Sequence, residues 1–157
     1  MRGLRRKEKE IDVNECKKII NKCKYITLAM SKNNIPYLVT ISHGYDSDQN
    51  FIYFHCAREG KKLDYIKENN NVWGQALLDQ GYQQGKCNHY YKSVHFKGEV
   101  EILHDFQEKK LALEMMINNL EEEPKIVKTQ QLTQQAIEKV TICKIKITAL
   151  SGKRSIN

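Results

Sequence analysis

Apolar side chains recur at helical spacing near the start of the chain, between residues 12 and 24. Asp12 stands where a helix N-cap is expected, and Glu15 follows it in the capping-box position. The apolar residues behind this cap share one helical face: Val13, Cys16, Ile19, Ile20 and Cys23. This spacing predicts a helix that runs to about Lys24.

Beyond that helix the pattern changes to short strand-prone runs separated by polar turns. From Val94 to Ile102, apolar residues and Gly98 alternate with His, Lys and Glu, which is typical of a half-buried strand. The runs that predict strands are 25–30, 36–43, 51–56, 72–78, 94–102 and 143–149. Residues 79–89 are polar and contain two glycines, so we expect a long loop there.

Two further helices are indicated between these strands, and a third segment allows another. A short helix is expected from Gly60 to about Asn69, and Asp105 with Glu108 repeats the capping box before an apolar stripe that ends near residue 121. The polar residues 125–139 allow one more short helix. Most consecutive strands have no helix between them, which disfavours a parallel βαβ sheet. We therefore predict a β-rich α+β fold, an antiparallel barrel of six strands with flanking helices.

Length and charge narrow the picture further. The 157 residues suit a single domain, 1–157, which opens with a basic arm, residues 1–11. The net charge of +7 favours an anionic partner: nucleic acid, an anionic membrane surface or a phosphorylated cofactor. The charged opening MRGLRRKEKE predicts no signal peptide, and no apolar run is long enough for a membrane span. The cysteines are odd in number and scattered, so we expect a reducing cytoplasm.

The segment FHCAREGKKLD is the most informative candidate site. A strand is expected to end at His55 and a helix to start near Gly60, so that Arg58, Lys61 and Lys62 crowd the helix N-terminus. Positive charge is unfavourable there unless an anion is present, because the helix dipole is itself positive at that end. The segment therefore predicts either a phosphate site or a solvated basic turn.

Several runs, taken in order, resemble one protein family. They are YITLAM, PYLVTISHGYD, FIYFHCAREGKKLDYIKENNNV, YYKSVHFKGEVEIL and IKITALSGKR, together with the basic opening. This set resembles the pyridoxamine-phosphate-oxidase-like flavin-binding split barrels, and most of all the branch of the nitroimidazole-resistance proteins. The similarity extends over nearly the whole chain.

The resemblance implies a six-stranded antiparallel split β-barrel domain that binds FMN at the interface of a homodimer. By position it implies cofactor contacts from Thr40, Ser42 and His43 at the flavin ring, Phe54 and His55 at the ribityl chain or ring, Arg58, Lys61 and Lys62 at the phosphate, and Ser93 as a further polar contact. His55 is also the catalytic candidate. The function implied is an FMN-dependent oxidoreductase for small organic acceptors such as nitroaromatics or quinones. No residues that would bind a pyridoxamine substrate are evident in the sequence, so we do not expect a vitamin B6 enzyme.

Alternatives remain at this point. His55 could bind cofactor or backbone without doing chemistry, and the chain could be a non-catalytic flavin or haem binder. Basic charge near Tyr82, Tyr90 and Tyr91 would suit single-stranded nucleic acid, but no nucleic-acid motif supports it. The Cys87 and His89 pair lacks a second ligand pair at recognisable spacing, so a polar loop is expected there and no metal.

Overall fold

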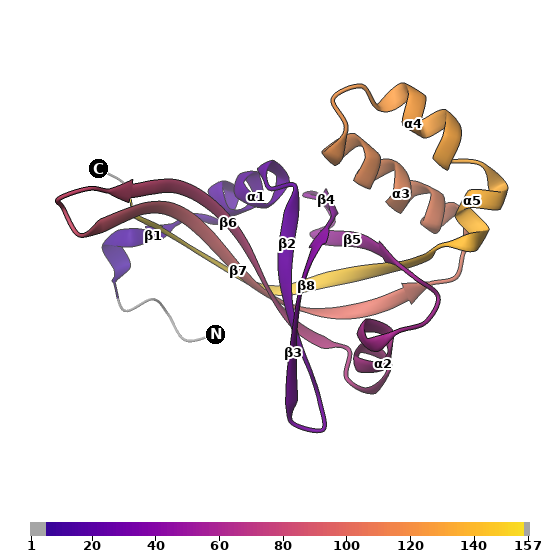
Figure 1. Ribbon diagram of the computed structural model, residues 1–157, viewed down its shortest axis with the longest axis horizontal. Coiled ribbons are helices and arrows are strands. Elements are labelled where there is room, and N and C mark those ends of the chain that lie inside the picture. Colours follow the sequence, from indigo (N-terminus) through magenta and orange to yellow (C-terminus); the bar gives the residue numbers. More distant parts are fainter. Residues whose placement is uncertain (1–5, 156–157) are drawn as a thin grey trace.

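The computed structural model describes residues 6–155, and their strands form one antiparallel sheet (Figure 1). Within this range the sheet has eight strands in the order β3-β2-β6-β7-β8-β5-β4, with β1 paired to β8. Their bounds are β1 Glu10–Ile11, β2 Tyr25–Lys32, β3 Ile35–Ser42, β4 Gly44–Asp46, β5 Phe51–Cys56, β6 Asn71–Gln83, β7 Asn88–Leu103 and β8 Thr141–Ser155. The sheet is open, and β3 and β4 are its edges.

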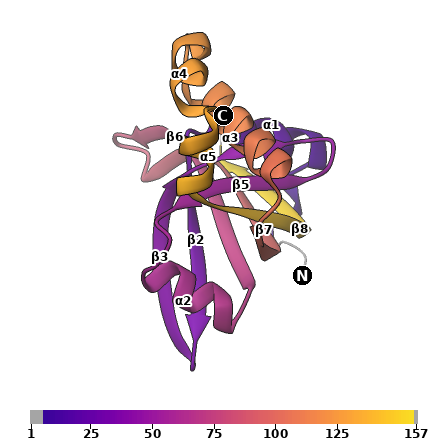
Figure 2. The same cartoon turned by 90° about the vertical axis from the view of Figure 1, so that its right-hand side faces the viewer.

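Helices flank this sheet at three places. Their bounds are α1 Val13–Lys22, α2 Lys61–Glu68, α3 Phe106–Leu120, α4 Pro124–Gln131 and α5 Gln134–Lys139, with a 3₁₀ turn at Lys7–Lys9. Both predicted caps are confirmed: the Asp12 carboxylate accepts from the backbone N–H of Glu15 at 2.8 Å, and Asp105 accepts from the N–H groups of Gln107 and Glu108, each at 2.9 Å. Figure 2 shows α3, α4 and α5 stacked at one end of the sheet and α2 beside β2 and β3.

The sheet buries apolar side chains in two separate clusters. The larger cluster joins α1 and α2 to the inner face of the sheet and includes Phe54, Phe96 and Leu28, each 0% exposed. The smaller cluster packs α3 and α5 onto β5 and β8, with Ile137 and Ile142 at its centre. Alternation along β5 explains this division, because successive side chains of a strand point to opposite faces.

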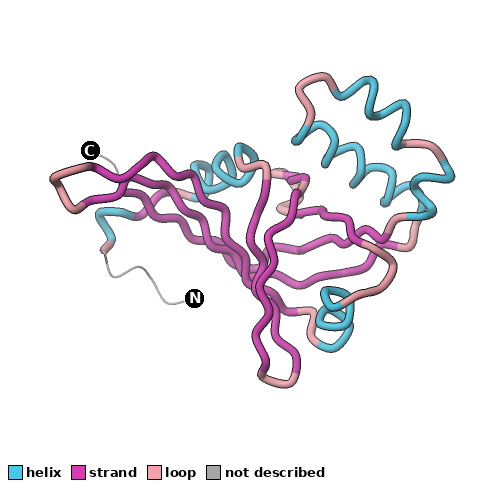
Figure 3. Tube along the Cα trace, viewed as in Figure 1, coloured by secondary structure: helices cyan, strands magenta, loops and turns pink. Residues whose placement is uncertain are grey.

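The predicted β-rich α+β fold class is confirmed, but details of the prediction were wrong. The sheet has eight strands where six were expected, since the short β1 and β4 escaped detection. Residues 79–89 are mostly strand: β6 and β7 form one long hairpin, and only its turn is loop (Figure 3). Residues 125–139 hold two helices. Residues 1–5 of the expected basic arm lie outside the described residues, and the rest of it forms the 3₁₀ turn and β1. No helix within residues 6–155 is long and apolar enough to cross a membrane.

Candidate functional site

One face of the sheet is exposed and carries polar groups from four neighbouring strands. The strand register places Thr40 of β3 beside Thr27 of β2, then Gln75 of β6 and His95 of β7. The Thr27 and Thr40 hydroxyls are 3.0 Å apart, and Gln75 Nε2 lies 2.9 Å from His95 Nε2. Alternation puts Ser42 and Ser93 on the same face. We call this surface the open face.

Apolar side chains accompany these polar groups on the open face. A shallow pocket of about 250 Å³ is lined by Thr27, Ala29, Leu38, Trp73, Gly74, Gln75 and His95. Leu38 is 65% exposed and Trp73 is 45% exposed, which is unusual for side chains of this size. The pKa of His95 is lowered mainly by partial burial and to a smaller extent by the nearby charge of Lys153, and this favours the neutral imidazole. The open face thus offers a flat apolar surface edged by neutral hydrogen-bonding groups.

Two of the residues predicted to contact the cofactor, His43 and Phe54, are buried in the protein. His43 is 0% exposed, and its Nε2 lies 3.1 Å from the carbonyl oxygen of Ile20 in α1. Burial lowers the pKa of His43 to about 4, so its imidazole is neutral. Phe54 is also 0% exposed and belongs to the larger core cluster. Neither side chain reaches the open face.

The start of α2 is basic, as predicted. Gly60 is the N-cap, at a φ of 131° that favours glycine, and among the side chains of residues 6–155 none accepts a hydrogen bond from the first N–H groups of the helix. The Lys61 ammonium lies 4.6 Å from the centroid of the Tyr37 ring. The Lys62 ammonium lies 5.5 Å from that of Phe54. Both lysines are thus held near the helix start by aromatic rings.

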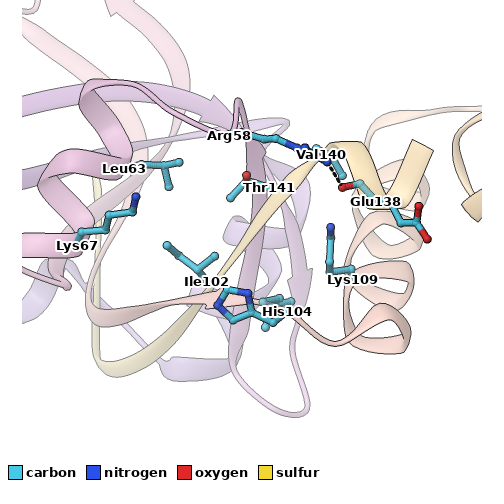
Figure 4. A pocket seen from close by; sticks show the side chains of 10 residues that line it. Arg58, Leu63, Lys67, Ile102, His104, Lys109, Glu138, Val140 and Thr141 are labelled. Atoms are coloured by element: carbon cyan, nitrogen blue, oxygen red, sulfur yellow. Dashed lines mark hydrogen bonds between the residues drawn. The ribbon is translucent and has the colours of Figure 1, made fainter. Parts of the chain in front are cut away.

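Arg58 does not join these lysines. Its guanidinium donates from Nη2 to the carbonyl oxygen of Glu138 at 2.7 Å and from Nε to that of Lys139 at 3.1 Å. The side chain borders a basic pocket of about 330 Å³ (Figure 4), whose other charged or titratable lining residues are Lys67, His104, Lys109 and Glu138. The predicted three-residue clamp is therefore divided between the α2 start and this pocket.

His55 lies on the other face of β5 from Phe54 and points under the α3–α5 helices. It borders a largely apolar pocket of about 330 Å³ whose lining includes Leu113, Met116 and Val140. The pKa of His55 is lowered mainly by partial burial and to a smaller extent by the positive charge of Lys62. A neutral imidazole facing an apolar pocket can accept a proton from a bound molecule. His55 is separate from the open face.

Cys87 and His89 lie at the tip of the β6–β7 hairpin. Cys87 adopts a φ of 45°, and His89 Nε2 contacts Asp79 Oδ1 at 2.7 Å. Among residues 6–155 there is no group of three or more His, Cys, Asp or Glu side chains arranged to hold a metal ion.

Sequence reasoning missed several residues that the fold brings to these surfaces. Trp73 and Gln75 join the open face, whereas Lys67 and Lys109 join the basic pocket. The strand alternation around His95 was a usable signal, because it assigned that side chain to the solvent face. The basic pocket had no such signal, since its residues come from distant parts of the chain.

The comparisons with known proteins agree on one fold. The family model described as pyridoxamine 5′-phosphate oxidase matches residues 12–154. None of the curated proteins searched is similar enough in sequence to match.

Solved structures resemble the chain over most of its length. A candidate 5-nitroimidazole antibiotic resistance protein from Bacteroides thetaiotaomicron has 24% identity and a TM-score of 0.78, over 92% of this chain and 86% of that one. The flavocytochrome Anf3 from Azotobacter vinelandii has 17% identity and a TM-score of 0.82, over 99% and 73%. An FAD-binding protein from Mesorhizobium loti has 22% identity and a TM-score of 0.69, over 94% and 97%. These likenesses show that the fold is shared.

Proposed function

The chain belongs to the pyridoxamine 5′-phosphate oxidase family, and on this premise we propose that it is an FMN-binding flavoprotein. We propose further that it is an oxidoreductase for small organic acceptors such as nitroaromatics or quinones. The names of two structural neighbours, a flavocytochrome and an FAD-binding protein, are consistent with a flavin in this fold. The observation that carries the proposal is the uncapped, basic start of α2.

A phosphate would suit that helix start on two counts. In the part of the chain that the structure describes, the first N–H groups of α2 have no side-chain acceptor, and the helix dipole favours an anion at this end. Lys61 and Lys62 add positive charge at this helix start. Their ammonium groups contact aromatic rings, and within residues 6–155 neither forms an ion pair with a carboxylate, although Asp64 lies in the same first turn. An FMN phosphate would thus replace an unfavourable concentration of positive charge with charge-assisted hydrogen bonds.

The flavin ring would need a flat surface, and the open face offers one. Trp73 and Leu38 present apolar area there, while Thr40, Gln75 and His95 present hydrogen-bonding groups. Within one chain the start of α2 contacts Tyr37, which precedes Leu38 on β3 and therefore points to the other face of the sheet. A homodimer, in which the partner completes each flavin site, would bring a ring surface and a phosphate site together.

Flavin would supply the hydride or electron transfer itself, and the protein would position it. The chain's own candidate for proton movement is His55, whose lowered pKa keeps it neutral at neutral pH. Within one chain this pocket beneath α3–α5 is separate from the open face, so the role requires a homodimer that brings the pocket of one copy next to the flavin of the other; His55 would then accept or relay a proton from a molecule in the pocket. The alternative is a flavin or haem binder without turnover. The visible spectrum of the purified protein distinguishes these cofactors, since haem gives a Soret band and flavin does not.

The proposal is tested by titrating the protein with FMN, riboflavin and FAD. We expect FMN to bind and riboflavin, which lacks the phosphate, to bind at least about tenfold more weakly, since a charge-assisted bond is worth roughly 1.5–3 kcal/mol. Lys62→Gln should weaken FMN about ten- to a hundredfold and leave riboflavin unchanged.

Lys67→Gln is the matched control, because Lys67 lies in the last turn of α2 and borders the basic pocket. It should not change FMN affinity. If Lys67→Gln weakens FMN and Lys62→Gln does not, the phosphate binds in the basic pocket. If FMN and riboflavin bind equally well, the phosphate site is refuted.

A further inference from the structure

We propose that Cys56 and Cys143 form a redox-active thiol pair, in which a hydroperoxide oxidises Cys56 and Cys143 then closes a disulfide with it. This proposal is independent of the flavin. It concerns the end of β5 that leads into the α2 start, and it assigns a chemical role to two cysteines on neighbouring strands.

The strand register places the two cysteines next to each other. In the β5–β8 ladder Phe54 is paired with Cys143, and Cys56 is paired with Thr141. Cys56 and Cys143 are therefore diagonal neighbours, and both side chains pack on the larger core cluster. The two thiols lie close enough for each to shift the pKa of the other. Both thiols thus lie on one side of the sheet, next to each other.

Their places in the strands suit the formation of a bond. Diagonal neighbours in a sheet are roughly 7–8 Å apart, whereas disulfides prefer a Cα separation of about 4.4–6.8 Å. A small backbone shift is needed, and Cys56 is the last residue of β5, followed by the turn that precedes α2. Cys143 lies inside β8 and is 0% exposed. The movement would therefore come from the Cys56 end.

The surroundings give the two thiols different roles. Interaction with the Cys143 thiol is the main cause that lowers the pKa of Cys56 to about 7; the charge of Lys62 acts in the same direction, and burial opposes both. Interaction with Cys56, together with burial, raises the pKa of Cys143. Cys56 is half-buried, so a small oxidant can reach it, and its lowered pKa gives it a larger thiolate fraction at neutral pH than an ordinary cysteine has. Cys56 is thus the attacking thiol and Cys143 the resolving one.

The other cysteines lack this combination. Cys16 and Cys23 are buried, and burial raises the pKa of each. Cys87 is exposed, but it lies in the turn of the β6–β7 hairpin, at the opposite end of the molecule from the end of β5 (Figure 1). Cys87 therefore serves as an internal reference for an accessible cysteine outside the pair.

Hydrogen peroxide is the only oxidant that this reaction needs. The Cys56 thiolate attacks one peroxide oxygen, the O–O bond breaks, and water leaves after protonation, which gives a sulfenic acid. The Cys143 sulfur then attacks the Cys56 sulfur, the S–O bond breaks, and a second water leaves with the Cys143 proton. Two thiols are oxidised by two electrons while one hydrogen peroxide is reduced to two waters. A dithiol reductant reverses the step by exchange.

The test uses the full chain, treated with stoichiometric hydrogen peroxide and mapped by mass spectrometry without reduction. We expect a disulfide between the peptides containing Cys56 and Cys143, lost on treatment with a dithiol. Before oxidation, Cys56 should react with iodoacetamide about three- to fivefold faster than an unperturbed thiol, because its larger thiolate fraction outweighs its lower nucleophilicity. Cys143→Ala should stop the reaction at a Cys56 sulfenic acid, trapped with dimedone.

Cys87→Ser is the matched control and should leave the Cys56–Cys143 disulfide unchanged. The mapping of the wild-type chain needs no variant, so it remains decisive if Cys143→Ala fails to fold. Two outcomes overturn the proposal. One is oxidation of Cys87 while Cys56 stays a thiol. The other is over-oxidation of Cys56 in the wild-type chain while Cys143 remains a free thiol.

Discussion

The guanidinium of Arg58 donates a 2.7 Å hydrogen bond from Nη2 to the backbone carbonyl oxygen of Glu138. This contact links the turn between β5 and α2 to the end of α5, which is more than seventy residues further along the chain. A cation is favoured at the C-terminal end of a helix, where carbonyl groups lack intrahelical partners. Arg58 therefore fastens two parts of the fold.

We predict that Arg58→Gln destabilises the protein. The change removes hydrogen bonds to the carbonyls of Glu138 and Lys139, and because the side chain is exposed we expect a loss of about 1–2 kcal/mol in the free energy of unfolding. Lys61→Gln is the matched comparison. It removes a contact with Tyr37 worth roughly 0.5–1 kcal/mol but also relieves the conflict with the α2 dipole, so its net effect should be near zero. Urea denaturation measures both. Equal losses for the two variants would contradict the division of roles.

Several features of the fold were predictable because they are encoded locally. The Asp12 and Asp105 caps depend on residues within three positions, and both form as predicted. The alternation of apolar and polar residues along β7 was readable in the sequence because one face of this strand is buried and the other is exposed. The outer part of the β6–β7 hairpin was missed because side chains there are exposed or only half-buried on both faces, so apolar and polar residues do not alternate along it. The pairing of Tyr82 with His89 nevertheless continues both strands into this outer part.

The candidate site was less predictable than the fold, for a physical reason. The segment FHCAREGKKLD predicted a basic helix start, which the structure has, but the direction of Arg58 depends on where α5 lies. His43 shows the same limit: its place beside α1 is a tertiary contact, invisible in the short strand pattern around it. Side-chain type was readable from sequence, whereas the partner of each side chain was set by long-range packing.

His43 gives a prediction for the pH dependence of stability. Its pKa is about 4 in the folded protein and 6.5 in the unfolded chain, so the unfolded chain binds more protons below pH 6.5. The contribution of neutral His43 is complete above pH 6.5 and is lost as pH falls towards 4. The loss amounts to about 3 kcal/mol.

His43→Gln, which can still donate to the Ile20 carbonyl but does not titrate, should lose about 3 kcal/mol less than wild type over this range. Parallel pH curves for the two proteins would refute this.

His55 is tested by its effect on turnover. If the imidazole moves a proton in the reaction, His55→Ala should bind FMN normally but reduce a nitroaromatic or quinone acceptor about 10²–10⁴-fold more slowly. Its lowered pKa means that activity depending on neutral His55 should be retained at pH 7 and fall as pH drops through its pKa. His104→Ala, in the basic pocket, is the control and should leave turnover unchanged. Turnover within a few-fold of wild type in His55→Ala would assign His55 a structural role only.

Trp73 tests the proposed homodimer. It is 45% exposed on the open face, where it lines a pocket together with Leu38, which is 65% exposed; Leu77, further along β6 on the same face, is 49% exposed. In a two-fold dimer in which the partner completes each flavin site, the open face of each copy is covered by the other copy, so Trp73→Glu would bury two unpaired carboxylates per dimer. We expect light scattering to give a dimer mass for wild type and a monomer mass for Trp73→Glu, with FMN affinity lost in parallel.

Ile126→Glu is the matched control, because Ile126 is 63% exposed on α4, away from this face. This variant should remain dimeric and retain FMN. A wild-type protein that binds FMN as a monomer would disprove the shared site, and a dimeric Trp73→Glu variant would place the interface on another surface.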